Sequence, residues 1–129
     1  MATDENPISK EVVDAAFKIH SKLGPGLLES IYEVTLAYEL RKRGLSVVRQ
    51  VPVPLVYEEL VFEEGYRLDL LIDDKVIVEV KSIETIMPIH KKQLLTYLRL
   101  QDKRLGLLIN FNEELIRDGI TRIVNGLRE

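Results

Sequence analysis

The chain has 129 residues, of which 46% are hydrophobic and 30% charged, which is the composition of one globular domain, residues 1–129, and not of a disordered chain. It contains no cysteine, which excludes disulfides, thiolate zinc sites and cysteine nucleophiles and fits a reducing cytoplasm, where we expect the protein to be located. A formal net charge of −3 argues against a protein that coats nucleic acid through bulk charge, although a local basic patch and a bound metal would still allow a nuclease.

The amino-terminal residues 1–6 are polar, and we expect them to be disordered. They have neither the basic region nor the apolar core of a signal peptide, and no apolar run of the chain is long enough to span a bilayer, so we expect no membrane partner. A first helix is predicted to begin at Pro7 or Ser9, because apolar side chains recur at helical spacing up to Leu23. Gly24 suits the cap that ends this helix.

A second helix is predicted between Gly26 and Gly44, with basic residues in its last turn. Strand segments are then predicted at residues 45–51, 53–57 and 60–62, interrupted by two prolines and by acidic turns at residues 58–59 and 63–65. A central hairpin at residues 66–82, a helix from Ile89 to Gln101 and strands at residues 103–110 and 119–125 follow. The resulting order, α-α-β-β-β-β-α-β-β, predicts a mixed α/β fold with a central sheet flanked by helices.

The central hairpin holds three charged residues, Asp69, Glu79 and Lys81, within otherwise apolar strands. Its register decides whether Asp69 faces Glu79. A two-residue turn at residues 73–74 would place Asp69 opposite a valine and scramble the apolar faces. A three-residue loop at residues 73–75 places Asp69 opposite Glu79 and keeps the apolar faces together, so we expect that loop, or else a bulge near Asp69. In this register the first strand presents one apolar face made of Leu68, Leu70 and Ile72.

Two opposed carboxylates have Cβ atoms about 4.5–5.5 Å apart and repel each other unless a cation lies between them. Mg²⁺ prefers oxygen ligands and typically takes one or two carboxylates, so Asp69 and Glu79 predict a Mg²⁺ site in which Mn²⁺ could substitute. Lys81 shares the face of Glu79 and would position a water or neutralise charge on a phosphate. The alternative is an ordinary surface ion pair between Glu79 and Lys81, with Asp69 as a polar residue near a strand end.

Two of the predicted helices carry further candidate residues for this site, and each of them also has a simpler structural explanation. Glu29 and Tyr32 share one face of the second helix, where an acid in the first turn is also favoured by the helix dipole. His90, Gln93 and Tyr97 form a polar stripe beside the leucines of the third helix, and such a stripe is also typical of a solvated helix flank.

Taken together, these segments resemble the GxxExxY family of small bacterial and archaeal proteins over about residues 8–127. The matching segments are Leu23-Gly-Pro-Gly-Leu-Leu-Glu-Ser-Ile-Tyr32, Asp69, Glu79-Val-Lys81, His90-x-x-Gln-Leu-Leu-Thr-Tyr-Leu98 and Leu105-Gly-Leu-Leu-Ile-Asn-Phe-Asn112. That family is similar to the PD-(D/E)XK nuclease superfamily, which implies a restriction-endonuclease-like core of α-β-β-β-α-β order. One departure is Leu68, which precedes Asp69 where the superfamily pattern has proline.

The resemblance implies that Asp69 is the first metal-binding carboxylate and that Glu79 and Lys81 form the E-x-K pair. Glu29 matches a helical glutamate that some branches add as a further metal ligand. A Q-x-x-x-Y pattern of some nuclease branches matches the third helix, and the residues that we expect to position substrate are Gln93, Tyr97, His90 and Tyr32.

We therefore expect a Mg²⁺-dependent nuclease that hydrolyses phosphodiester bonds, with DNA favoured over RNA as the substrate. Its catalytic residues would be Asp69, Glu79, Lys81 and Glu29. The alternative is a catalytically inactive module of the same fold that binds nucleic acid or a protein partner, which the negative net charge and the lack of a DNA-binding appendage favour. A homodimer or a complex with a partner protein is compatible with either function.

Overall fold

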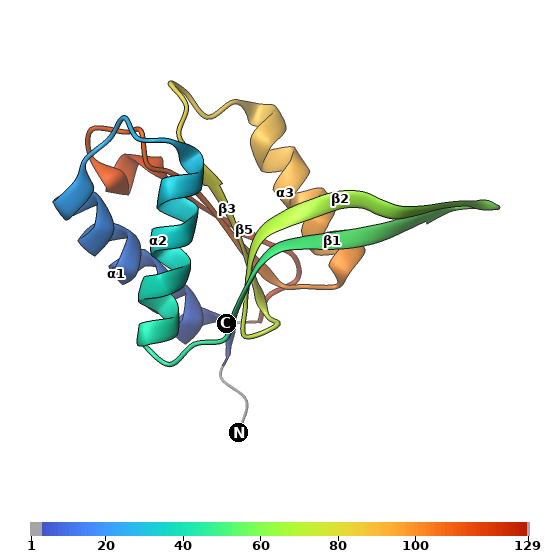
Figure 1. The fold of residues 1–129 in the computed structure, drawn as a ribbon. Helices are drawn as coiled ribbons and strands as arrows, with labels where there is room; N and C mark the ends of the chain where they lie inside the picture. The colour runs from blue at the N-terminus through green and yellow to red at the C-terminus, as the bar shows by residue number, and fades with distance from the viewer. Residues whose placement is uncertain (1–3, 129) are drawn as a thin grey trace.

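Three α-helices, one short 3-10 helix and five strands make up residues 4–128, the part of the chain that the computed structural model describes (Figure 1). In chain order these elements are α1 (Glu5–Leu23), α2 (Glu29–Lys42), β1 (Val47–Tyr57), β2 (Leu60–Ile72), β3 (Val76–Lys81), α3 (Pro88–Gln101), β4 (Leu105–Asn110), η1 (Ile116–Gly119) and β5 (Ile120–Val124). The strands form one mixed sheet in the order β1-β2-β3-β4-β5, in which only β3 and β4 are parallel, because α3 crosses over between them. The predicted mixed α/β fold is confirmed.

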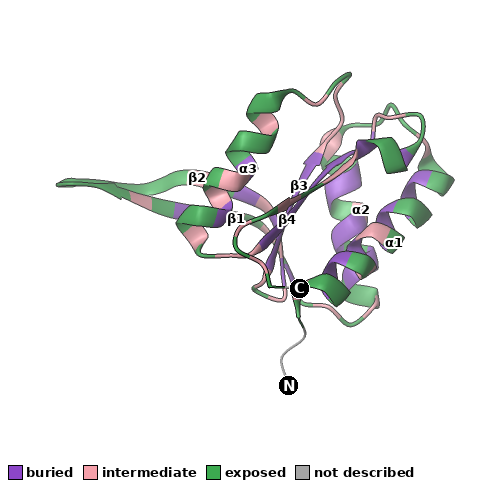
Figure 2. Cartoon of the chain, turned by 180° about the vertical axis from the view of Figure 1, so that it is seen from behind, coloured by how far each residue is buried: buried purple, intermediate pink, exposed green. Residues whose placement is uncertain are grey.

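The sheet separates two apolar cores, and its central strands β3 and β4 are buried on both faces (Figure 2). This double burial explains why β3 and β4 read as nearly continuous apolar runs. On one face α1 and α2 cover a core that includes Ile8, Val12, Leu36, Leu40, Leu70, Val78 and Leu107. On the other face α3 contributes Leu94 and Leu98, which pack with Leu68, Ile77 and Leu108. No helix within residues 4–128 combines the length and the apolar character needed to cross a membrane.

The first helix begins earlier than the sequence pattern predicts. Glu5 and Asn6 already belong to α1, so the expected disorder of residues 1–6 is wrong for these two residues. A negative charge at Glu5 is favoured by the helix dipole, and Pro7 is tolerated in the first turn because its missing N–H needs no partner there. Residues 1–3 of the expected disordered segment lie outside the described part of the chain.

Strand β2 runs without a break through residues 63–65, so the turn predicted there is wrong. Gly65 allows β2 to lie close to β1, since a Cβ at this position would lie 2.4 Å from Cβ of Leu55. The prolines likewise do not end β1, whose register shifts around Pro54. The turn predicted at residues 58–59 is confirmed. The separately predicted strand segments therefore merge into one long β1–β2 hairpin, whose outer part projects from the body (Figure 1).

Strands β1 and β2 change faces between their inner and outer halves. Leu70 packs in the core under α1 and α2, whereas Leu68, two residues away, packs in the core under α3. Side chains two residues apart share a face of a regular strand, so β2 is irregular at Asp69. On the neighbouring strand, Arg49 pairs with Leu70 and Val51 pairs with Leu68, so Gln50 lies opposite Asp69. Gln50 has a left-handed φ of 52°. The prediction that Leu68, Leu70 and Ile72 share one face is therefore wrong.

Replacing Leu94, which is 1% exposed, with alanine should destabilise the protein by about 2–5 kcal/mol, because the variant leaves a cavity between α3 and the sheet. Leu100 is the matched control on the same helix, since it is 51% exposed, and its alanine variant should change stability by less than about 0.5 kcal/mol. Urea unfolding followed by circular dichroism measures both variants. Equal losses would contradict the packing of α3 on the sheet.

Candidate active site

The loop between β2 and β3 sets the register of the two strands that carry the acidic residues. It has three residues, 73–75, as predicted, since the observed pairs are Leu70 with Val78, Leu71 with Ile77 and Ile72 with Val76. The two aspartates of the loop have left-handed φ values of 49° and 56°, which aspartate tolerates better than most residues. The two-residue turn, which would have placed Asp69 opposite a valine, is excluded.

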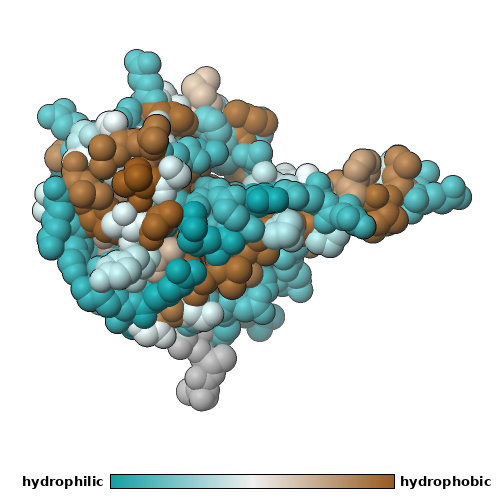
Figure 3. Space-filling view, in the orientation of Figure 1, coloured by the Kyte–Doolittle hydropathy of each residue, from teal (hydrophilic) through white to brown (hydrophobic). Residues whose placement is uncertain are grey.

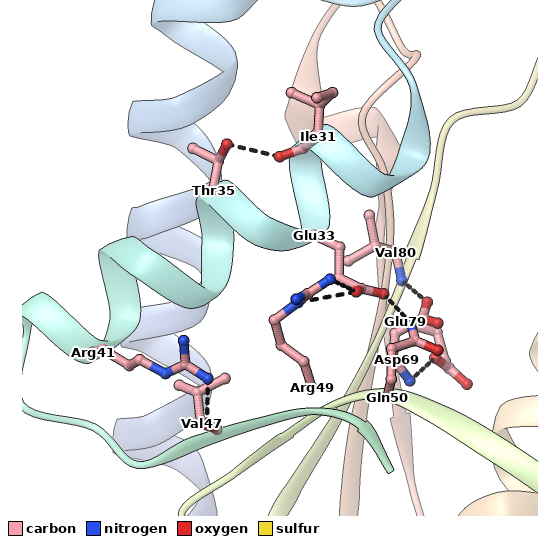
Figure 4. A network of polar contacts seen from close by, with 10 residues as sticks. All are labelled: Ile31, Glu33, Thr35, Arg41, Val47, Arg49, Gln50, Asp69, Glu79 and Val80. Carbon is pink, nitrogen blue, oxygen red and sulfur yellow. Dashed lines mark hydrogen bonds and ion pairs between the residues drawn. The ribbon is translucent and has the colours of Figure 1, made fainter. Parts of the chain in front are cut away.

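Beyond Leu70 the backbone pairing of β2 with β3 stops, and two carboxylates take its place (Figure 4). The N–H of Asp69 donates to Oε2 of Glu79 at 3.0 Å, and the N–H of Val80 donates to Oδ2 of Asp69 at 2.9 Å. Each carboxylate thus accepts a hydrogen bond from the opposite strand. The structure therefore brings Asp69 and Glu79 together, in the opening where the two strands separate.

Glu79 lies in a strongly unfavourable place for a negative charge, because it is only 7% exposed. Its burial, followed by the charge of Asp69, raises the pKa of Glu79 to about 9, against the opposing influences of the Asp69 N–H and the Lys81 ammonium. A hydrogen bond between the two side chains also favours the protonated form of Glu79. At neutral pH Glu79 therefore favours its protonated form, and a divalent cation would have to displace that proton.

Glu29, in the first turn of α2, adds a third acidic group to this electrostatic cluster. Burial raises the pKa of Glu29, the Lys81 charge lowers it, and the Asp69 charge raises it further. The backbone N–H of Ser82 donates to Glu29 and opposes the rise. These couplings place the start of α2 beside the carboxyl end of β3, where half-buried Lys81 lies.

The number of adjacent carboxylates decides whether this region can hold a divalent cation. Within residues 4–128, no three His, Cys, Asp or Glu side chains lie close enough together to hold a metal ion by themselves. Glu29 is therefore coupled to the pair through charge and does not complete a compact three-carboxylate group. Two adjacent carboxylates do fit Mg²⁺, which typically takes one or two carboxylates and fills its other positions with water or substrate oxygen.

Among the candidates on α3, Tyr97 interacts with the carboxylates. Burial raises the pKa of Tyr97, and the charges of Glu79 and Asp69 raise it further. Its ring stacks on Tyr66, with centroids 4.5 Å apart and an interplanar angle of 10°. Helix α3 therefore brings a phenol to the side of the site opposite α2.

His90 and Gln93 occupy different places from Tyr97. Nδ1 of His90 accepts a hydrogen bond from the N–H of Met87 at 2.9 Å, so His90 caps the start of α3. Gln93 is exposed on the outer surface of the helix. Of the polar stripe read from the sequence, one member lies by the carboxylates, one caps the helix and one faces solvent.

Tyr32 lies in the core and not at the surface. It is fully buried, and its ring stacks on Phe111 at a centroid distance of 4.6 Å. Its hydroxyl donates to the carbonyl of Gly24 at 2.6 Å and accepts from the N–H of Leu27 at 3.1 Å. Tyr32 therefore holds the loop that leads to Glu29, and it offers no surface that a substrate could reach in this conformation.

Glu33 is a residue of this region that the sequence reading overlooked. It is 4% exposed, and it accepts hydrogen bonds from Nη2 of Arg49 at 2.8 Å and from Nε2 of Gln50 at 2.6 Å (Figure 4). Through Gln50 it fixes the irregular point of β1 opposite Asp69. Its spacing of four residues from Glu29 on α2 was the signal that could have revealed it.

Asn110 is a second overlooked residue, and it closes the site beyond Lys81. Its side chain is fully buried, accepts from the N–H of Ile83 at 3.1 Å and donates to the carbonyl of Ile83 at 2.9 Å. Asn110 also pairs with Lys81 in the parallel ladder of β3 and β4. The sequence signal for this role was an asparagine at the end of an otherwise apolar strand. A buried amide there needs hydrogen-bond partners, which the neighbouring backbone supplies.

The chain matches the family model described as the PD-(D/E)XK nuclease superfamily over residues 6–123. The match spans most of the chain and includes every element of the site described above. The protein therefore belongs to the PD-(D/E)XK nuclease superfamily, whose nucleases generally use divalent metal ions. Comparison with curated proteins and comparison with solved structures each yield no match.

The raised pKa of Glu79 predicts how the stability of the metal-free protein depends on pH. Because the folded chain holds this proton more tightly than the unfolded chain, stability should fall as the pH rises from about 4.5 to about 9. Glu79→Gln removes most of this fall and should stabilise the metal-free protein at pH 8 by a few kcal/mol, since each pKa unit is worth about 1.4 kcal/mol. Urea unfolding in the presence of a chelator measures the effect.

Glu84→Gln, at an exposed position, is the matched control and should follow the wild-type pH profile. If the stability of Glu79→Gln also followed the wild-type pH profile, the tightly held proton of Glu79 would be absent.

The hydroxyl of Tyr32 should stabilise the fold through its two buried contacts. Tyr32→Phe is expected to cost about 1–3 kcal/mol, because Gly24 and Leu27 lose a partner in a buried place. Tyr38→Phe is the control, since Tyr38 is 63% exposed, and it should leave the thermal midpoint nearly unchanged. A wild-type midpoint for Tyr32→Phe would argue against this role in the loop.

Proposed function

We propose that the protein is a divalent-metal-dependent nuclease that hydrolyses phosphodiester bonds, with DNA favoured over RNA. The observation that carries the proposal is the pair formed by half-buried Asp69 and buried Glu79, held where β2 and β3 separate, with Lys81 beside it. Membership of the PD-(D/E)XK nuclease superfamily supports the same activity. A buried carboxylate with a strongly raised pKa in such a cluster is also typical of a functional site.

The carboxylates of Asp69 and Glu79 are the proposed ligands of the metal, which would be Mg²⁺, with Mn²⁺ able to substitute. Bound there, Mg²⁺ would supply Lewis-acid stabilisation to a phosphate oxygen and help to ionise water. Asp69 and Glu79 would contribute one or two oxygens after Glu79 loses its proton. Glu29 would act through a bound water, since it does not join a compact group of three carboxylates.

Lys81 is the proposed catalytic cation. Its positive charge lowers the pKa of both Glu29 and Glu79, so it acts on the start of α2 and on the carboxylate pair. From this place it would orient the attacking water and offset negative charge that develops on the phosphate. Tyr97 would orient Lys81 or the substrate from the α3 side, and exposed Gln93 would contact substrate at the rim.

Within the superfamily, we assign the chain to the GxxExxY family. The segment Gly26-x-x-Glu29-x-x-Tyr32 supplies the motif. Its three members have separate tasks in this fold: the glycine has a left-handed φ of 96°, the glutamate approaches Lys81, and the tyrosine anchors the loop between them. This division of tasks gives a physical reason for the spacing.

The competing function is a non-catalytic module of the same fold that binds nucleic acid or protein. The net charge of −3 favours it, because bulk charge does not attract a polyanion. Such a module needs no metal, so Mn²⁺ titration by calorimetry separates the two functions. We expect a saturable Mn²⁺ site in the wild type that Glu79→Ala abolishes. Equal Mn²⁺ binding by both proteins, or none by either, would favour the module.

Cleavage assays test the activity itself. Purified protein should cut single-stranded or double-stranded DNA when Mg²⁺ or Mn²⁺ is present, and Lys81→Ala should lower kcat/KM by about 10²-fold or more, as expected for the loss of a group that stabilises developing charge. Lys10→Ala, at an exposed position on α1, is the matched lysine control and should cut like the wild type. Cleavage by Lys81→Ala at the wild-type rate, or no cleavage of any DNA or RNA by the wild type, would contradict the proposal.

A further inference from the structure

The outer part of the β1–β2 hairpin carries large apolar side chains into solvent. We call residues 55–64 the hairpin arm. Its exposed apolar residues are Val56, Tyr57, Leu60, Val61 and Phe62, with exposures from 48% to 68%. An isolated two-stranded hairpin is only marginally stable in water, and an apolar one is also prone to associate. Strand pairing joins Tyr57 to Leu60 and Val56 to Val61, so Tyr57, Leu60 and Phe62 share one face of the arm, and Val56 and Val61 lie on the opposite face. The larger face, made of Tyr57, Leu60 and Phe62, therefore has the character of a surface that is covered in the working form of the protein.

The charge of the hairpin arm argues against nucleic acid as the covering partner. Its tip and β2 side hold four glutamates, Glu58, Glu59, Glu63 and Glu64. No lysine or arginine occurs from residue 51 to residue 66, and Arg67 at the base of the arm pairs with Glu64 at 2.6 Å. The remaining glutamates, Glu58, Glu59 and Glu63, leave the arm with a net negative charge. Such a segment repels phosphate, so the partner that fits it is a protein surface with an apolar centre and a basic end.

A surface of this kind lies on α2 of the same chain. We call the exposed apolar residues Leu28, Ile31, Val34 and Tyr38 the α2 stripe, and their spacing of three or four residues places them along one side of the helix. The stripe ends at Arg41 and Lys42, and Nζ of Lys42 lies 5.8 Å from the ring centroid of Tyr38. An amphipathic helix normally buries such a stripe, but here it faces solvent.

The two surfaces match in length as well as in character. The stripe spans ten residues of helix, or about 15 Å at about 1.5 Å per residue. Each side of the hairpin arm has about five residues, or about 17 Å at about 3.3 Å per residue. Figure 3 shows apolar surface on the projecting hairpin and, separately, on the part of the body formed by α1 and α2.

One chain cannot bring these surfaces together, because the arm projects away from the side that α1 and α2 occupy (Figure 1). Pairing one arm with another is disfavoured, since it would oppose four glutamates with four more. Pairing an arm with the α2 stripe of a second copy instead places acidic residues beside basic ones and covers the stripe and the larger apolar face of the arm.

We propose that the chain forms a two-fold symmetric dimer, in which the hairpin arm of each copy lies along the α2 stripe of the other. The two contacts are reciprocal, so the assembly closes at two copies and covers the α2 stripe and the larger apolar face of the arm in each copy. Because α2 also carries Glu29 and the base of the hairpin carries Asp69, each contact involves two elements that build the candidate active site.

Sedimentation equilibrium of the full chain tests the dimer, independently of any nuclease activity. The wild type should show twice the chain mass of 14.8 kDa. Leu60→Asp, at a position that is 59% exposed on the larger apolar face of the arm, should raise the dissociation constant at least tenfold. Leu115→Asp, at a position that is 50% exposed outside both surfaces, should leave it unchanged. A monomeric wild type, or equal effects of the two variants, would overturn the proposal.

Reversing one charge on each surface tests whether the arm contacts the α2 stripe. This test does not place a new charge in an apolar contact. Glu59→Lys and Lys42→Glu should each weaken their own dimer at least tenfold, by placing like charges together. A mixture of the two variants should recover dimers near the wild-type affinity, because every arm then meets a helix of opposite charge. Weakening by Lys42→Glu without recovery in the mixture would overturn the arm–helix pairing, and so would tighter association of Glu59→Lys, which indicates pairing between arms.

Discussion

The structure depends on the reciprocal hydrogen bonds that replace backbone pairing between β2 and β3. Two strands that separate inside a protein leave N–H groups without partners, which is costly. Here the carboxylate of Asp69 accepts from Val80 and that of Glu79 accepts from Asp69, so the strands separate while these N–H groups stay bonded. The residues that could bind a cation are thus the same ones that keep these backbone groups bonded.

Three elements from distant parts of the sequence meet at this opening, and each has its own support. Tyr32 anchors the loop that precedes Glu29 on α2. Stacking on Tyr66 holds Tyr97 on α3. Asn110 ties the end of β4 to the chain just beyond Lys81. The candidate active site therefore depends on both helical layers of the fold and not on the hairpin alone.

The sequence predicted the parts of this arrangement that follow from local rules. Alternation of apolar residues was sufficient to choose a three-residue loop over a two-residue turn, and so to bring Asp69 next to Glu79. A bulge near Asp69 was predicted only as the alternative to the three-residue loop, whereas the structure has the loop and also an irregular strand at Asp69, opposite the left-handed Gln50. A glycine after two glutamates reads as a turn, and only the proximity of Leu55 shows that Gly65 belongs to a continuous strand.

Tertiary packing also decided which polar residues reach the site. His90 and Tyr97 are equivalent in a helical pattern, yet one caps α3 and the other lies by the carboxylates, because only the second faces the sheet. Tyr32 and Glu33 show the same limit: both are buried, the tyrosine holding a loop and the glutamate holding Arg49 and Gln50. Spacing identifies a shared helix face, but the neighbours of that face determine what each side chain does.

The left-handed conformation of Gln50 has a consequence for how this site can vary. A β-branched residue is strained at such a φ, whereas glycine or asparagine adopts it readily. Gln50 has no reactive group in the proposed chemistry, yet its conformation sets where β1 and β2 change faces, next to Asp69. A substitution at this one position would therefore act on the strand geometry beside Asp69 while every charged side chain of the candidate site is kept.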